Sequence, residues 1–276
     1  MNRPVHPSPQ PLTRFVLALQ SRAELRLALE GEQGGHHRLS ALPQATLERW
    51  LDDVASTVAG MDRKAAAAYL VGYLSWELAL GLGFMRLEGH GVPDVPADAF
   101  SAHLEPYNLE GKRYLRVSLL LADQNAPCLA LDASGVSRLI RDWFTPFLAQ
   151  VHITSQLGRT ALWRIVGDNV AAAWLWIGKS SGDHQRAMAD AELVIHAEGS
   201  PLSNKQLRFF KVEARDRADP ERVVACEWFH ARGGCCRYYT TGESGGEFCF
   251  TCVLRSPASM HDILVRDLLE QTSTSP

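Results

Sequence analysis

Apolar residues recur at helical spacing along much of the first half of the chain. Between Gln44 and Ala59 they fall at i, i+3, i+4 and i+7, which predicts an amphipathic helix with one buried face. The stretch from Ala65 to Phe84 is apolar almost throughout and carries one charge, Glu77. Its length would allow a membrane span, but a carboxylate inside a bilayer is costly. We therefore predict a buried core helix, capped by Asp62.

The same periodicity and the turn residues between stretches predict the other elements. Further helices are expected over Thr13 to Glu30, from near Val136 to about His152 after a cap at Ser134, over Arg159 to Ile177, over His184 to Ala197, and over Ser259 to Gln271 with Ser259 as its cap. Pro146 should kink or end the helix that starts near Val136. Strands are expected over Phe100 to Tyr107, Arg113 to Ala122, Leu207 to Ala214 and Val223 to Phe229. Pro106 should make the first strand an edge strand.

Helices and strands alternate without a regular βαβ order, so the sequence predicts the α+β class. Residues 1–12 contain four prolines and are expected to form a flexible arm. Residues 13–222 are predicted to be a helix-rich α+β domain with a small antiparallel sheet. The charged run from Arg215 to Arg222 marks the boundary to a C-terminal four-cysteine module, residues 223–276.

Charge and the N-terminal sequence exclude several classes of function. The 276 residues carry a net charge of −3 at pH 7, so no broad basic field for nucleic acid is expected. The N-terminus has no apolar core of a signal peptide. We therefore expect a cytoplasmic protein without a transmembrane span, in a compartment where thiols stay reduced.

The cysteines are concentrated near the C-terminus. Five of the six lie between Cys226 and Cys252, and Cys128 lies apart. Cys235 and Cys236 are adjacent, twelve residues follow, and Cys249 begins a C-x-x-C pair that ends at Cys252. The intervening segment is predicted to be strand, glycine turn and strand, a hairpin that would bring the two pairs together. Cys226 and Cys128 are expected to be small buried residues.

Four thiolates in this arrangement admit more than one metal centre. Zinc sites usually draw each half of their ligands from C-x(2–4)-C turns, which fits Cys249 and Cys252 but not the adjacent pair. A [2Fe–2S] cluster is wider and needs two thiolates on each of two irons, which favours it here. A disulfide is disfavoured in a reducing compartment. Residue chemistry alone leaves both metal centres open.

The cysteine motif resembles that of one family. Arg232-Gly-Gly-Cys235-Cys236-Arg-Tyr-Tyr, followed by Cys249-Phe-Thr-Cys252, is similar to the C-C-x10-C-x2-C motif of the FhuF-type ferric-siderophore reductases. The spacer is two residues longer here, and the extra residues are expected in the glycine turn. The alanine-rich stretch that carries Trp163 and Asn169 also looks like the helix before the cluster region in that family.

The resemblance implies a cytoplasmic oxidoreductase that holds a [2Fe–2S] cluster on Cys235, Cys236, Cys249 and Cys252. Its substrate would be a ferric siderophore of the hydroxamate type, which releases its iron after one-electron reduction because Fe(II) binds hard oxygen ligands more weakly. No flavin or nicotinamide motif is visible, so an external donor, a reductase or a ferredoxin, is expected. Peripheral association with the uptake machinery is a further expectation.

Residues near the motif are candidates for substrate contact and for tuning the cluster. We predict substrate contacts from an aromatic and basic wall near the cysteines, with Trp228, Arg237, Tyr239 and Arg255 as its main members. Arg232 and Gly234 are predicted to stabilise negative charge on sulfur through a cation and a backbone N–H group. The same residues could instead pack the module or cover its surface.

Two rival hypotheses follow from the same sequence. One is a non-catalytic protein whose four cysteines hold a structural zinc. The other is a [2Fe–2S] electron carrier or iron sensor with no siderophore substrate. The siderophore, the electron donor, the reduction potential and the oligomeric state are not fixed by the sequence.

Overall fold

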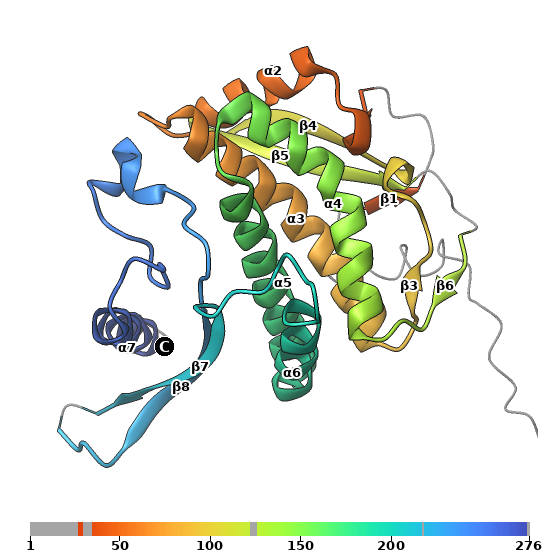
Figure 1. Cartoon of the computed structure of the whole chain (residues 1–276). Helices are drawn as coiled ribbons and strands as arrows, with labels where there is room; N and C mark the ends of the chain where they lie inside the picture. Colours follow the sequence, from red (N-terminus) through yellow and green to blue (C-terminus); the bar gives the residue numbers. More distant parts are fainter. Residues whose placement is uncertain (1–26, 30–34, 122–125, 217, 275–276) are drawn as a thin grey trace, which may run out of the picture.

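The computed structural model describes residues 27–29, 35–121, 126–216 and 218–274, and confirms the α+β class (Figure 1). The helices in these ranges are α2 (Gln44–Ala55), α3 (Arg63–Leu87), α4 (Ala133–Ser155), α5 (Arg159–Ser181), α6 (His184–Ile195) and α7 (Pro257–Thr274). The strands are β1 (Leu27–Leu29), β2 (His37–Arg38), β3 (Val92–Pro93), β4 (Phe100–Leu109), β5 (Lys112–Leu121), β6 (Cys128–Leu129), β7 (Arg208–Arg215) and β8 (Val223–Ala231).

The largest sheet has the strand order β1-β5-β4-β2. Strands β4 and β5 form an antiparallel hairpin in which Phe100 pairs with Leu121 and Leu109 with Lys112. Strand β2 pairs with β4 at Ser101 and Ala102, and no other described residue pairs with that edge of β4. Pro106 lies on this open edge, where its missing N–H group breaks no bond of the sheet. The predicted strands and the edge position of Pro106 are therefore confirmed.

Helix α3 is the centre of the larger core. It contacts α2, α4, α5 and strand β5, and its residues from Ala65 to Ala68 are all buried. The Asp62 side chain accepts a hydrogen bond from the Ala65 N–H group at 2.7 Å, as the sequence predicted for the cap. In the described part of the chain, α3 is the one helix long and apolar enough to cross a membrane, and 72% of its most apolar stretch is buried inside the protein. It is a core helix, as predicted.

Helices α3 and α5 pack unusually closely because a glycine lies at their contact. A Cβ atom on Gly83 would stand 2.5 Å from the Trp174 side chain and 2.6 Å from that of Ile177. The Trp174 indole fills this space and donates its Nε1–H to the Ala79 carbonyl at 3.0 Å. Further along, the Asn169 amide of α5 donates to the Gly72 carbonyl of α3 at 2.9 Å. These contacts fix α5 against α3, and α5 carries the support for the cysteine loop.

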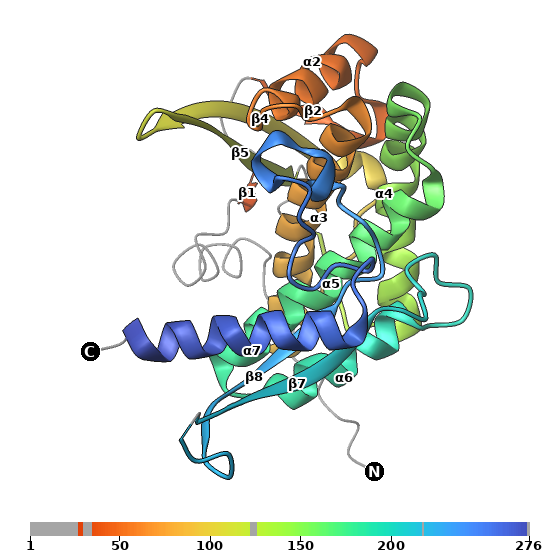
Figure 2. The same cartoon turned by 90° about the vertical axis from the view of Figure 1, so that its left-hand side faces the viewer.

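A second, smaller core joins the C-terminal elements. Strands β7 and β8 form an antiparallel hairpin, and α7 packs across it (Figure 2). The buried residues of this core are Val212, Ala214, Ala231, Met260, Leu264 and Leu268. The domain boundary proposed at residue 222 falls in the turn between β7 and β8. The loop from residue 232 to 256 leaves this small core and extends along α3 and α5 before α7 begins (Figures 1 and 2).

The helix predicted over Thr13 to Glu30 is wrong in its described part. Residues Leu27–Leu29 form β1, which pairs in parallel with β5, so sheet pairing prevails over local helix propensity. Residues 13–26 and 30 lie outside the described residues, as does the predicted flexible arm, 1–12. Pro146 also neither ends α4 nor interrupts it. The buried side chains of Phe144 and Phe147 on either side of Pro146 hold the helix in the core.

Two predicted helix caps are displaced. At α4 the Asp132 carboxylate, not Ser134, accepts the hydrogen bond of the Gly135 N–H group, at 2.7 Å. At α7 the Ser256 hydroxyl accepts from the Ser259 N–H group at 3.2 Å, so the cap is Ser256 and Ser259 lies inside the helix. The observed caps lie two residues earlier at α4 and three residues earlier at α7, so each helix begins before the predicted residue.

Candidate metal centre

The cysteine loop is not the hairpin that the sequence predicted. In place of two strands, residues Tyr238–Thr240 and Gly242–Ser244 form two short 3-10 turns. The chain reverses through a left-handed backbone at Arg237 (φ 63°) and again at Gly245 and Gly246. The Gly242 N–H group donates to the Ala59 carbonyl at 2.7 Å, so the loop docks onto the connection before α3. Contacts to the helical domain, which a pattern within the loop cannot reveal, determine its conformation.

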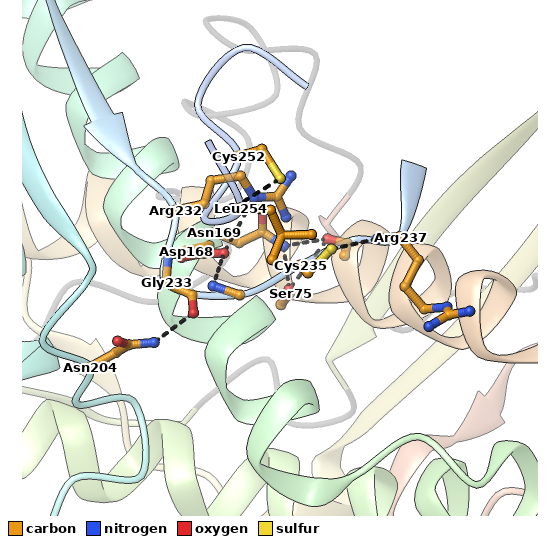
Figure 3. A network of polar contacts seen from close by, with 12 residues as sticks. Ser75, Asp168, Asn169, Asn204, Arg232, Gly233, Cys235, Arg237, Cys252 and Leu254 are labelled. Carbon is orange, nitrogen blue, oxygen red and sulfur yellow. Dashed lines mark hydrogen bonds and ion pairs between the residues drawn. The ribbon is translucent and has the colours of Figure 1, made fainter. Parts of the chain in front are cut away.

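A buried carboxylate anchors the loop directly before the adjacent cysteines (Figure 3). Asp168 of α5 is 1% exposed, and its two oxygens accept from the backbone N–H groups of Gly233 at 2.6 Å and Gly234 at 3.0 Å. The Arg232 guanidinium donates to the same carboxylate at 3.3 Å. Burial raises the pKa of Asp168 to about 6, while Arg232 and the two N–H groups act in the opposite direction. Asp168 thus fixes the backbone one residue before Cys235.

The two glycines are required because the loop lies almost in contact with its support. A Cβ atom on Gly234 would stand 2.9 Å from the Arg164 Cβ atom and 3.2 Å from an Asp168 oxygen. On the other side of the loop, the buried Asn204 amide donates to the Gly233 carbonyl at 2.7 Å (Figure 3). The sequence prediction gave Gly234 a free N–H group for a cysteine sulfur, but that group donates to Asp168.

We predict that Gly233→Ala lowers the free energy of unfolding by about 1–3 kcal/mol, because the new methyl group overpacks the loop. Its Cβ atom would lie 2.4 Å from the Asn204 amide nitrogen and would push that side chain off the Gly233 carbonyl. Urea unfolding measures the change. Gly72→Ala is the control. Its Cβ atom would stand 3.9 Å from the Asn169 amide nitrogen, without a clash. Alanine in this helix interior should raise the free energy of unfolding by about 0.5–1 kcal/mol. Equal stability of Gly233→Ala and the unaltered protein would contradict the prediction.

The four cysteines meet as two neighbouring pairs. Cys249 hydrogen-bonds to Cys236 through its thiol, which lowers the pKa of Cys236 and raises that of Cys249. Burial raises the thiol pKa of Cys235, and the charges of Cys252 and Cys236 act in the same direction, while the Arg237 N–H group opposes them. Cys252 itself is 3% exposed. The docked loop thus does what the predicted hairpin was expected to do, and brings the two ends of the motif together.

Backbone and side-chain donors surround these sulfurs. The Arg237 N–H group donates to Cys235 Sγ at 3.3 Å and the Leu254 N–H group to Cys252 Sγ at 3.5 Å (Figure 3). The nearby Arg232 is held charged by Asp168 and by the thiols of Cys236 and Cys249, which raise its pKa although burial opposes this. Arg232 thus lies near the thiols, and the stabilisation of negative charge on sulfur that the sequence suggested for it stays a prediction.

A cavity of about 760 Å³ opens beside one of the cysteine pairs. Helix α3 supplies an aromatic stripe to it, and α5, α7 and the cysteine loop close the other sides. The residues that line it are Ala68, Tyr69, Gly72, Tyr73, Trp76, Ile165, Asn169, Arg232, Cys236, Tyr238, Glu247, Phe248, Cys249, Phe250, Arg255, Ile263 and Arg266. A mostly apolar wall with a few polar groups is typical of small-molecule sites.

Of the four predicted substrate residues, Arg255 alone lies in this lining. It donates to the backbone carbonyls of Phe248 and Cys249 at 2.6 and 3.0 Å, and so also holds the loop. Trp228 lies on β8 with its ring 6.0 Å from that of His184. Arg237 turns toward Asp62 and pairs with it at 2.6 Å. Tyr239 packs its ring 5.3 Å from Phe248 and thus stands behind the cavity wall.

The sequence reasoning missed Asp168 and the aromatic stripe. Tyr69, Tyr73 and Trp76 were assigned to an undifferentiated core helix, although their spacing of four and three residues puts them on one face. This spacing could have identified the three aromatic side chains as one continuous face of the helix. No comparable local signal marked Asp168, because its partners lie more than sixty residues away.

Comparison with models of known families found no match for the chain, and comparison with curated proteins found no significant match. The resemblance to the FhuF-type reductases therefore rests on the motif residues alone.

The donors that the cysteine loop offers to a metal centre are the four free thiols of the motif. In the described ranges no three His, Cys, Asp or Glu side chains are grouped closely enough to hold a metal ion. Cys236 and Cys249 lie within hydrogen-bonding reach of each other, and the charges of Cys252 and Cys236 both act on Cys235. Thiolate sulfur is a ligand both of [2Fe–2S] clusters and of structural zinc.

Proposed function

We propose that this chain is a cytoplasmic ferric-siderophore reductase whose C-terminal module holds a [2Fe–2S] cluster on Cys235, Cys236, Cys249 and Cys252. The observation that carries the proposal is that Cys236 and Cys249 form part of the wall of a cavity large enough for a chelate. When bound, the cluster would supply one electron, so that an external donor is oxidised by one electron and the substrate iron goes from Fe(III) to Fe(II).

The residues of the chain would position the chelate and stabilise the charge that develops. The stripe of Tyr69, Tyr73 and Trp76 offers flat apolar contact to the organic ligand. The Asn169 amide nitrogen donates to Gly72 and Ser75, which orients its oxygen as an acceptor at the cavity wall. Arg232 lies beside Cys236 and Cys249 and favours added negative charge there.

The direct test is to mix dithionite-reduced protein, freed of excess reductant, with ferrioxamine B, a ferric trihydroxamate, under anaerobic conditions. Ferrozine traps the Fe(II) that forms. We expect one Fe(II) for each reduced protein, with reoxidation of the protein at the same rate. A protein that stays reduced in the presence of the chelate would be an electron carrier or sensor, and a protein that cannot be reduced and holds one zinc would be structural.

Trp76→Ala should raise KM for the ferric hydroxamate about tenfold, equivalent to about 1.4 kcal/mol of lost contact, with little change in kcat. The Trp76 side chain lines the cavity and is not one of the proposed cluster ligands, so its loss should weaken substrate binding without changing electron transfer. Tyr114→Ala is the matched control, because Tyr114 is 40% exposed on the β4–β5 hairpin. An unchanged KM for Trp76→Ala would place the chelate elsewhere.

A further inference from the structure

The cysteine loop has a second face besides the one toward the cavity. Cys236 and Cys249 belong to the described lining of the cavity, and Cys235 and Cys252 do not. Cys235 is half-buried, and Leu254, whose N–H group donates to Cys252 Sγ, has 51% of its surface exposed. An exposed leucine next to a buried cysteine places an apolar spot on the outer side of the site.

Two exposed cations, Arg164 and Lys205, lie next to the two glycines that precede Cys235. Arg164 lies under Gly234, as shown by the 2.9 Å separation between its Cβ atom and a Cβ atom built on that glycine. Lys205 directly follows Asn204, whose amide binds the Gly233 carbonyl. Both side chains are exposed.

Two more cations lie at the other end of the same segment. Arg237, next to Cys236, pairs with Asp62 at the start of α3. Lys64 follows two residues after Asp62 and is exposed. Lys64, Arg164, Lys205 and Arg237 are the four cations around this face, and Asp62 is paired to Arg237. The cysteine loop also carries two exposed carboxylates, Glu243 and Glu247, of which Glu247 lies 3.6 Å from the Arg255 guanidinium.

This positive patch is a local feature, because the whole chain has a net charge of −3. Within the described residues, Lys64, Arg164 and Lys205 have no ion-pair partner in this molecule. Cations without internal partners around an apolar spot fit a protein partner of opposite charge. Complementary charge of this kind raises association rates and orients weak electron-transfer encounters.

We propose that the surface formed by Lys64, Arg164, Lys205, Arg237 and Leu254 docks a small acidic one-electron carrier protein. The inference rests on the proposed function and deepens it, since it separates the side that meets the donor from the side that meets the substrate. The carrier would approach Cys235 and Cys252 from outside while the chelate occupies the cavity beside Cys236 and Cys249. Donor and substrate would then bind at the same time without competition.

The test measures binding of a plant-type ferredoxin, a small acidic carrier, to the full-length protein by biolayer interferometry at about 20 mM and about 200 mM salt. The triple variant Lys64→Glu, Arg164→Glu, Lys205→Glu should weaken binding at least about tenfold at low salt. The unaltered protein should lose most of its affinity at high salt. Lys112→Glu, at the exposed β4–β5 turn, is the matched control and should bind normally.

Several results would overturn the proposal. Ferredoxin binding that is unchanged in the triple variant would do so, as would binding that a saturating ferric hydroxamate displaces. Binding of a DNA duplex in place of ferredoxin would assign the patch to nucleic acid. If the triple variant unfolds, Arg164→Gln and Lys205→Gln, measured singly, give the same comparison. The dithionite assay with ferrioxamine B needs no carrier, so the proposed function stands or fails independently of this experiment.

Discussion

Replacing Asp168 with alanine is expected to lower the free energy of unfolding by about 3–5 kcal/mol, because it leaves a buried guanidinium without its counter-charge. Arg232 would lose its partner, and the buried N–H groups of Gly233 and Gly234 would lose their acceptors. The backbone before Cys235 would also lose its anchor. We therefore expect poor retention of metal in the same variant, measured as iron bound per chain.

Two controls separate the role of the carboxylate from a general effect of mutation. Asp142→Ala removes an exposed carboxylate paired only with its neighbour Arg141, and should change stability by less than about 0.5 kcal/mol. Asp168→Asn keeps one oxygen acceptor and the volume of the side chain, so its cost should be smaller than that of the alanine variant. Equal urea midpoints for Asp168→Ala and the unaltered protein would show that the contacts to the loop contribute nothing.

Serine in place of Cys236 or Cys249 is expected to reduce bound iron and acid-labile sulfide by about tenfold or more. Both thiols belong to the proposed ligand set, and a hydroxyl is a much poorer ligand for iron–sulfur clusters than a thiolate. Iron and sulfide are measured on protein purified without oxygen. Thermal unfolding of the same samples shows whether the chain remains folded after the cluster is lost.

The remaining cysteines provide the matched controls. The prediction that Cys226 is buried is wrong, because Cys226 is exposed on β8 opposite Glu213. Cys128 lies partly buried on β6 against the larger core. Cys226→Ser and Cys128→Ser should each retain iron and sulfide at the level of the unaltered protein. Loss of iron in either control, or retention in Cys236→Ser, would mean that the ligand set is different.

The helical frame was predictable because its information is local. The i, i+3, i+4, i+7 pattern in α2 identified Leu47, Trp50, Leu51 and Val54 as its buried face, and all four are fully buried. The Asp62 cap and the β4–β5 hairpin were likewise set by neighbouring residues. The cysteine motif itself indicated where the site would be, because thiols are rare and their spacing carries chemical meaning.

The conformation of the site was not predictable from the same signals. β-branched and aromatic residues after Cys236 favoured a strand, but Gly242 bonds to Ala59 and the segment forms 3-10 turns. The choice of β1 over a helix depended on pairing with β5. Asp168 could not be assigned, since only the fold brings α5 beneath the loop. In each case contacts distant in sequence prevail over local preference.

The most direct test of the account is an anaerobic absorption and EPR spectrum of the purified protein before and after addition of dithionite. A [2Fe–2S] cluster on the four cysteines predicts visible absorption bands that bleach on reduction, together with a rhombic S = 1/2 signal that appears only in the reduced sample. A colourless, EPR-silent protein that contains one zinc per chain would contradict the account and leave the four cysteines as a structural site.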